Sequence, residues 1–108
     1  MKPTRYYSNK QEKKVAKTLK GKQTSNSGAT KFSKGDVVLQ DWLLECKTKT
    51  NLSNSFTIKR DWFDKNKEEA FAMHKEHNAL VIDFGDGEQH YIIDEPLFKV
   101  LVKALNDV

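Results

Sequence analysis

Two acidic residues and a lysine near the middle of the chain have the types and the spacing of a metal site. If Gln40 and Asp41 form a two-residue turn between two strands, Asp36 lies directly opposite Glu45. Residues opposed in this way have Cβ atoms roughly 4.5–5.5 Å apart. Two carboxylates at that distance repel each other unless a divalent cation lies between them, because hard cations prefer oxygen ligands. Lys47 is two residues beyond Glu45, so an extended strand places both side chains on one face. The hairpin therefore predicts a cation site with a lysine beside it.

A third acidic residue, Glu12, is predicted to face the apolar side of the first helix. That helix is expected over residues 8–20, since Ser8 and Gln11 have the spacing of a capping box and Gly21 follows as a stop signal. At helical periodicity Glu12 shares its side with three apolar residues, Val15, Ala16 and Leu19. A buried carboxylate without a partner is costly, so we expect the cation site to be the partner of Glu12.

The rest of the pattern predicts the elements that hold these residues. Residues 22–35 are basic and rich in Ser, Thr and Gly, which predicts a long loop of a kind that is more often functional than idle. Apolar spacing predicts a helix over 58–77 and a terminal helix that opens at Pro96. Strands are expected at 36–39, 42–48, 79–84 and 89–93, with a turn at 85–87. The order α-β-β-α-β-β-α describes one α/β domain over 1–108, with a central mixed β-sheet flanked by helices.

Four short motifs resemble a known family. They are Glu12, Ser27-Gly28-Ala29, Gly35-Asp36-Val37 and Glu45-Cys46-Lys47-Thr48. Their order and spacing resemble those of the archaeal-type Holliday-junction resolvases and of similar small nucleases encoded by bacteriophages, which belong to the PD-(D/E)xK endonuclease superfamily. Gly35 stands where that superfamily has its proline. The resemblance continues over residues 55–62, 79–84 and 91–98, and it implies a restriction-endonuclease-like core.

The resemblance also implies an endonuclease site that depends on Mg²⁺ or Mn²⁺. Asp36 and Glu45 would hold the metal together with the backbone carbonyl of Cys46, and Glu12 would complete the site directly or through water. Lys47 would orient the attacking water or stabilise the charge that develops on phosphorus. This is metal-assisted hydrolysis, in which the cation polarises the phosphate and lowers the pKa of bound water.

The expected substrate is branched DNA rather than a small molecule. The resemblance implies that Ser27 touches the scissile strand. Glu12 is the only acidic residue between Lys2 and Lys34, and such a basic segment favours contacts with phosphates. The lysines expected at the phosphates are Lys10, Lys14, Lys31, Lys34 and Lys49. A homodimer would hold two sites that nick a four-way junction symmetrically.

Three alternatives stay open from the sequence. One is a nuclease of the same fold that acts on flaps, forks or duplex DNA, because a fold and its metal site do not choose the substrate. The others are a non-catalytic DNA-binding protein and a structural subunit of a larger assembly.

Several other residues favour structural roles. His74 and His77 lack further nearby ligands for a tetrahedral zinc site, and they are expected at the surface or at a helix end. Cys46 alternates with Glu45, so its side chain is expected to be buried on the opposite face. Three aromatic residues could stack on bases, but their helical spacing favours packing in the core or in a dimer: Trp62, Phe63 and Phe71.

The composition favours a small cytoplasmic protein. Hydrophobic residues make up 37% of the 108 residues and charged residues 31%, which allows a modest core to which a dimer would add burial. The formal net charge of +4 favours a polyanionic partner. The single cysteine excludes an intrachain disulfide, and neither a signal peptide nor a membrane-spanning run is expected. We therefore expect no membrane partner and a cytoplasmic location, which is the host cytoplasm if the chain is phage-encoded.

Overall fold

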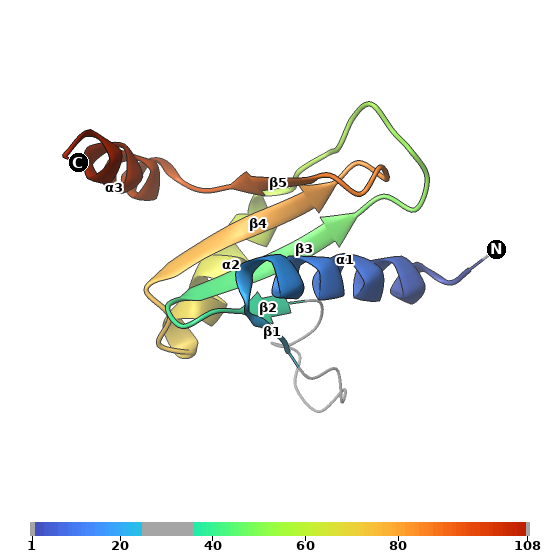
Figure 1. Ribbon diagram of the computed structural model, residues 1–108, viewed down its shortest axis with the longest axis horizontal. Coiled ribbons are helices and arrows are strands. Elements are labelled where there is room, and N and C mark those ends of the chain that lie inside the picture. Colours follow the sequence, from blue (N-terminus) through green and yellow to red (C-terminus); the bar gives the residue numbers. More distant parts are fainter. Residues whose placement is uncertain (1, 25–35, 108) are drawn as a thin grey trace.

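The computed structural model of the protein describes residues 2–24 and 36–107, and in those ranges its centre is a five-stranded mixed sheet (Figure 1). The strands are ordered β1-β2-β3-β4-β5, and only β3 and β4 run parallel to each other. The predicted α/β class with a mixed sheet flanked by helices is confirmed. The elements along the chain are α1 (Thr4–Leu19), β1 (Lys22–Gln23), β2 (Asp36–Val38), β3 (Trp42–Thr48), α2 (Arg60–Ala72), β4 (His77–Asp83), β5 (Gln89–Ile92) and α3 (Glu95–Asn106).

The β2–β3 hairpin has the register predicted from the sequence. Asp36 pairs with Glu45, and the two following pairs are in step with it. The Leu39 N–H donates to the Trp42 carbonyl at 3.0 Å and closes the two-residue turn. Beyond the hairpin, α2 connects β3 to the parallel strand β4. Alternation along β3 places Glu45 and Lys47 on one face of the sheet.

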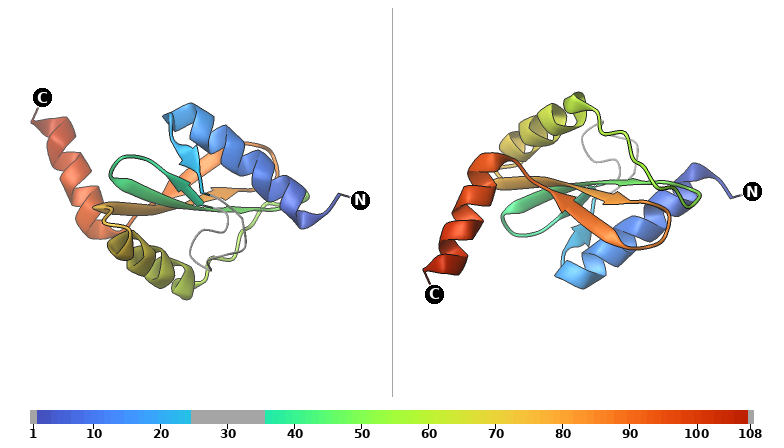
Figure 2. Two further views of the ribbon diagram at one scale, coloured as in Figure 1. Left: turned by 90° about the horizontal axis from the view of Figure 1, so that it is seen from below. Right: turned by 90° about the horizontal axis from the view of Figure 1, so that it is seen from above.

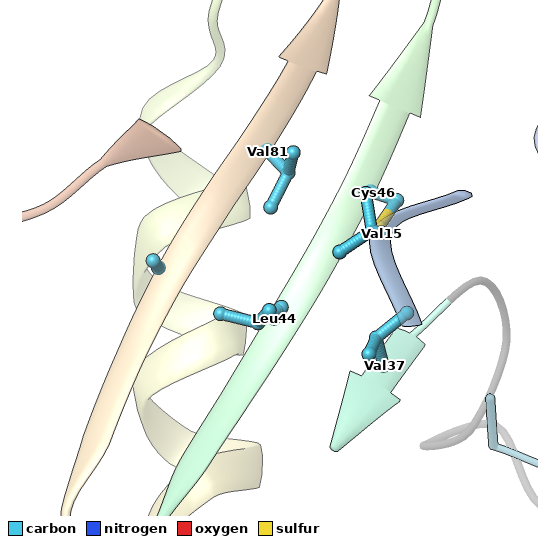
Figure 3. Packing of buried hydrophobic residues seen from close by; sticks show 6 residues of the cluster. Val15, Val37, Leu44, Cys46 and Val81 are labelled. Atoms are coloured by element: carbon cyan, nitrogen blue, oxygen red, sulfur yellow. The ribbon is translucent and has the colours of Figure 1, made fainter. Parts of the chain in front are cut away.

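Helices α1 and α2 lie on opposite faces of the sheet (Figure 2). The face under α1 holds the main apolar cluster (Figure 3). Cys46 belongs to this cluster, as its alternation with Glu45 predicted, and burial raises the pKa of its thiol. The face under α2 therefore carries the opposite set of side chains from β2 and β3, which includes the acidic residues. The residues of the cluster are Val15, Val37, Leu44, Cys46, Ala79 and Val81.

Helix α1 begins at Thr4, after Pro3, so the predicted start at Ser8 is wrong. The capping-box interpretation fails because Gln11 turns its side chain to the sheet instead. Its amide donates to the Lys47 carbonyl at 2.9 Å and to the Val81 carbonyl at 3.1 Å. Helix α1 ends at Leu19, just before the predicted stop at Gly21, and the left-handed residue that caps it is Lys20, with a φ of 59°. Gly21 is required for a different reason, since a Cβ at this position would approach a side-chain carbon of Leu39 to 2.3 Å.

Strand β1 lies in the segment predicted as a loop, so the observed order is α-β-β-β-α-β-β-α. It pairs with β2 in antiparallel orientation, with Gln23 opposite Val37. Neither Lys22 nor Gln23 is apolar, and hydrophobic periodicity therefore had no signal to detect there. A short edge strand needs only backbone partners, which β2 supplies.

Helix α2 is shorter than predicted, with bounds at Arg60 and Ala72 in place of 58–77. His74 has a positive φ of 60°, and the Lys75 N–H donates to the Ala70 carbonyl at 2.8 Å. This local left-handed turn ends the helix, so β4 begins at His77, earlier than expected.

Helix α3 begins as predicted, with Pro96 in its first turn and the Asp94 side chain accepting from the Leu97 N–H at 3.2 Å. Leu97 is buried, but Leu101 is 39% and Leu105 77% exposed. The helix extends away from the body of the protein (Figures 1 and 2). Across the described ranges, no helix combines the length and the apolar composition that crossing a membrane requires.

Candidate metal centre and the adjoining hollow

Three carboxylates from three different elements gather on the α2 side of the sheet. Asp36 of β2, Glu45 of β3 and Glu69 of α2 each offer an oxygen, and these oxygens lie within 4.8 Å of one another. Asp36 is 1% exposed, whereas Glu45 and Glu69 are half-buried. The structure thus brings together the two acids that the hairpin register predicted and adds a third, which we call collectively the acid cluster.

Glu69 reaches the other two acids because α2 is anchored to the sheet one turn earlier. Asn66 is fully buried, its amide donates to the Leu43 carbonyl at 3.4 Å, and its oxygen accepts from the Asn78 amide at 2.8 Å. Glu69 follows Asn66 by one helical turn, so both side chains lie on the inner side of α2. The sequence interpretation missed Glu69. The available signal was an acid on the inner side of a helix, the same criterion that singled out Glu12.

Each carboxyl group of the acid cluster has a raised pKa, because the groups are at least partly shielded from solvent and carry charges of the same sign. Burial, followed by the charges of Glu69 and Glu45, raises the pKa of Asp36 to about 9. Burial also raises the pKa of Glu45, although Lys47 beside it acts in the opposite direction. Burial and the charge of Glu45 raise the pKa of Glu69. In the absence of a cation, a proton on Asp36 relieves part of the repulsion.

The acid cluster fits a hard divalent cation. Within residues 2–24 and 36–107, no hydrogen-bond donor reaches the buried Oδ1 atom of Asp36. A buried acceptor without a partner is costly, and a cation among the three carboxylates would satisfy it. Ligand sets made only of oxygen suit Mg²⁺ and Mn²⁺ better than Zn²⁺ or Cu²⁺. Asp36, Glu45 and Glu69 are therefore the residues that would hold the predicted Mg²⁺ or Mn²⁺.

Lys47 lies beside the acid cluster, and two neighbours hold its ammonium group. Its Nζ atom is 3.6 Å from Oε2 of Glu45 and 4.6 Å from the centroid of the Trp62 ring. The side chain is 35% exposed, so the ammonium group is accessible from solvent. The predicted proximity of Glu45 and Lys47 is confirmed, while the catalytic role of Lys47 stays a prediction.

Glu12 is buried on the apolar side of α1, as its position in the sequence predicted, with 1% exposure. Its carboxylate accepts a hydrogen bond from the Gln23 amide at 3.3 Å. Burial raises the pKa of Glu12, and Gln23 and Arg5 act in the opposite direction. Glu12 is outside the acid cluster, although its charge contributes to the raised pKa of Asp36. The contribution of Glu12 and of the Cys46 carbonyl to metal binding stays a prediction.

A hollow of about 560 Å³ adjoins Lys47 between α1 and the segment that follows β3. We call it the aromatic hollow, because two rings contribute to its wall together with cationic and polar side chains. The charged and aromatic residues of the wall are Arg5, Glu12, Lys47, Lys49, Phe56 and Trp62.

The residues predicted to contact DNA differ in their surroundings. Ser27, Lys31 and Lys34 lie outside the described residues. Lys10 is exposed on α1, whereas the Lys14 ammonium group donates to the Gly87 carbonyl in the turn before β5. Lys49 is half-buried in the wall of the aromatic hollow. Of the described lysines in this set, Lys14 is thus the one that donates to a backbone carbonyl.

The other side chains weighed from the sequence take varied positions. His74 is at the end of α2 as expected, and the His77 ring packs against the Trp42 ring at a centroid distance of 4.9 Å. Phe71 is 84% exposed, so the expectation that it packs in the core is wrong, and its packing in a dimer stays a prediction. Trp62 faces the aromatic hollow, where the sequence favoured the core.

Comparisons of the chain with protein-family models, curated proteins and solved structures find no match. The resemblance to the PD-(D/E)xK superfamily accordingly stays a prediction, based on the motifs and on the geometry of the acid cluster.

Proposed function

We propose that the protein is a divalent-metal-dependent endonuclease with a restriction-endonuclease-like core of the PD-(D/E)xK type. The observation that carries the proposal is the convergence of Asp36, Glu45 and Glu69, with the Lys47 ammonium group 3.6 Å from Glu45. One buried and two half-buried carboxylates close together destabilise a protein unless a positive charge compensates them. A surface that only binds DNA would gain nothing from them, since carboxylates repel phosphates. A catalytic cation explains their presence.

The chemistry that these residues support is hydrolysis of a phosphodiester. A cation bound by Asp36, Glu45 and Glu69 would supply the positive charge that polarises the phosphate and favours attack by water. Lys47, held between Glu45 and the Trp62 ring, places a donor where it orients water or stabilises the charge that develops on phosphorus. In the net reaction the attacking water loses a proton to solvent and its oxygen bonds to phosphorus, one ester P–O bond breaks, and the leaving oxygen takes up a proton from solvent.

The substrate that we propose is branched DNA, in particular a four-way junction cut by paired symmetric nicks. Support comes from the exposed lysines of α1 and from the cations in the wall of the aromatic hollow, Arg5, Lys47 and Lys49. Contacts to phosphates position a protein by the shape of the DNA rather than by its sequence. Flaps, forks and duplex DNA are the alternative substrates of the same site.

We also propose that the enzyme is a homodimer formed through α3. The helix carries an apolar stripe at helical spacing that its own chain leaves exposed, Phe98, Leu101, Val102 and Leu105. An apolar groove of about 420 Å³ adjoins this stripe and is lined by Trp42, Tyr91, Ile93 and Leu101, among others. Contiguous exposed apolar surface of this kind marks interaction sites, and a second copy offers the complementary apolar surface with two-fold symmetry.

A panel of labelled DNAs tests this function. The protein would be incubated with a four-way junction, a fork, a flap and linear duplex, with Mg²⁺, with Mn²⁺ and with chelator. We expect paired nicks in the junction that require the metal and are lost in Glu45→Ala. Metal-dependent cutting of all four DNAs alike would support the endonuclease activity and refute its selectivity for the junction. Tight binding of DNA without any cutting in either metal would refute the proposed enzymatic activity.

A further inference from the structure

The aromatic hollow shares Lys47 with the candidate catalytic site, so any ligand in the hollow lies next to the acid cluster. Its two rings are held in place by packing. The Phe56 ring meets the Trp62 ring edge to face at a centroid distance of 6.4 Å, and it meets the Phe84 ring in the same way at 5.9 Å. Both Phe56 and Trp62 remain half-exposed. Rigid rings that are open to solvent are suited to contact a planar ligand.

Cations surround these rings. The Lys47 Nζ atom lies 4.6 Å from the Trp62 centroid, and the Lys49 Nζ atom lies 5.2 Å from the Phe56 centroid. Arg5 adds a third positive side chain from α1. Glu12 is the carboxylate in this wall, and its Oε1 atom accepts a hydrogen bond from the Gln23 amide. The net charge of the wall is positive, which favours an anionic ligand.

An anionic ligand with a planar group is what a nucleotide in a nucleic-acid strand presents. Proteins that bind single strands combine basic side chains for the phosphates with aromatic side chains for the bases. The volume of about 560 Å³ is within the ~300–1,000 Å³ range of pockets for small ligands, so the hollow is large enough for a nucleotide and too small to enclose a duplex. A base that is paired and stacked in a duplex must first leave its stack to enter such a pocket.

We propose that the aromatic hollow binds one unpaired nucleotide of a DNA strand, next to the phosphate that is cut. Trp62 and Phe56 contact the base, and Arg5 and Lys49 contact the flanking phosphates. The position relative to the cut rests on the proposed endonuclease function, whereas the binding itself requires no metal. The hollow would direct the enzyme to points where a strand leaves the duplex, as at a fork, a flap or an opened branch point.

Tryptophan fluorescence tests the proposal in the absence of metal. The chain has two tryptophans, so Trp42→Phe leaves Trp62 as the only one. Stacking of a base on Trp62 quenches its emission. In EDTA, we expect an oligothymidylate to quench this emission, and we expect a fully paired hairpin of equal length and the mononucleotide dTMP to quench it far less at the same concentration. The wild-type chain with an oligonucleotide that carries 2-aminopurine provides a second measurement that does not depend on the Trp42→Phe variant.

Variants locate the binding in the hollow. Trp62→Leu should weaken binding of the single strand on the order of tenfold or more, because stacking contributes that much per base, and Trp62→Phe should retain most of the affinity. Phe71→Leu is the matched control, since Phe71 is an exposed aromatic residue of the same helix outside the hollow.

Three results would overturn the proposal. They are equal quenching by hairpin and single strand, equal affinity for dTMP and the oligonucleotide, and strand binding by fluorescence anisotropy that leaves the emission of Trp62 unchanged. The two proposals fail separately. If single strands quench the emission but the protein never cuts DNA, the endonuclease function is refuted and nucleotide binding in the aromatic hollow stands. If the protein cuts DNA with metal but shows no preference for unpaired strands, only the binding of an unpaired nucleotide is refuted.

Discussion

A carboxyl oxygen of Asp36, the first residue of β2, lies within 4.8 Å of a carboxyl oxygen of Glu69 on helix α2. A hydrogen bond between two carboxyl groups requires one proton between them. With Glu45 close to both, the metal-free protein keeps a proton where a cation would otherwise compensate the negative charge. Binding of metal, binding of protons and stability of the fold are therefore coupled at this point.

Replacement of Glu69 by Gln should change stability in opposite directions with and without metal. In EDTA, Glu69→Gln should raise the free energy of unfolding on the order of 1 kcal/mol, because it removes one of three repelling carboxylates. In Mn²⁺ at a hundredfold excess over its Kd, the wild type should gain ~2.7 kcal/mol, and the variant should gain less than about half of that. Urea denaturation with and without Mn²⁺ measures both values.

Glu68→Gln is the matched control, since Glu68 is an exposed neighbour on α2. It should behave as the wild type in both conditions. An undiminished Mn²⁺ effect in Glu69→Gln would show that Glu69 does not bind the cation.

The stability of the metal-free protein should fall as the pH rises. The pKa of Asp36 is raised to about 9, whereas an aspartate in the unfolded chain titrates near ~3.9. Below that lower value both states are protonated and the shift has no effect. Between about 4 and 9 the folded state keeps a proton that the unfolded state has lost, so a higher pH favours unfolding, by up to about 1.4 kcal/mol per pH unit for one proton. The raised pKa values of Glu45 and Glu69 act in the same direction.

Urea denaturation in EDTA at pH 5, 7 and 9 measures this dependence. Asp36→Asn should make this dependence shallower, because it removes the group whose pKa is raised to about 9. Saturating Mn²⁺ should reverse its sign, since the cation competes with the proton. A free energy of unfolding that stays constant or rises over this range in EDTA would contradict the raised pKa of Asp36.

Lys47 should contribute to the cutting step far more than to DNA binding. We expect Lys47→Ala to lower the cleavage rate on the order of 10²–10³-fold, as the loss of one stabilising donor does in other hydrolytic sites. Its effect on affinity should be small. The salt dependence of DNA binding should change by the amount expected for the loss of about one phosphate contact. Single-turnover cleavage and binding by anisotropy at several salt concentrations measure the two effects. Lys13→Ala, at an exposed position on α1, is the control. If the Lys47→Ala protein cuts DNA at the rate of the wild type, Lys47 has no role in the cutting step.

A charge in the apolar stripe of α3 should prevent dimerisation. Leu105 is 77% exposed in the single chain, so Leu105→Glu should leave the fold intact while it weakens the dimer at least about tenfold, because a charge would be buried in the interface. Lys103→Glu, at an exposed position of the same helix, is the control for the added negative charge. Sedimentation equilibrium measures both. A wild-type protein that remains monomeric at all accessible concentrations would refute the dimer.

The parts of the site that depend on local geometry were predictable from the sequence. The turn at Gln40 and Asp41 determines the pairing of Asp36 with Glu45, because a two-residue turn leaves one register. Alternation along a single strand likewise places Lys47 beside Glu45 and buries Cys46. These inferences need only neighbouring residues and the period of an extended chain.

The parts that depend on how elements pack were not predictable in the same way. Glu69 joins the acid cluster because the Asn66 side chain binds the backbone of β3. A polar residue with this role cannot be recognised from the periodicity of hydrophobic residues. The start of α1 was misplaced because Gln11 bonds to the sheet rather than to its own helix. The leucines of α3 indicate a helix but not whether their partner belongs to the same chain.

The most direct test of the proposed function is cleavage of a labelled four-way junction by the wild type and by Glu45→Ala, in Mg²⁺ and in EDTA, with Glu68→Gln as the control. We predict strand cleavage by the wild type and by Glu68→Gln in Mg²⁺, none in EDTA, and a loss of at least about 10²-fold in Glu45→Ala. Cleavage that persists in EDTA or in Glu45→Ala, or its absence from the wild type in both Mg²⁺ and Mn²⁺, would contradict a metal-dependent endonuclease built on Asp36, Glu45 and Glu69.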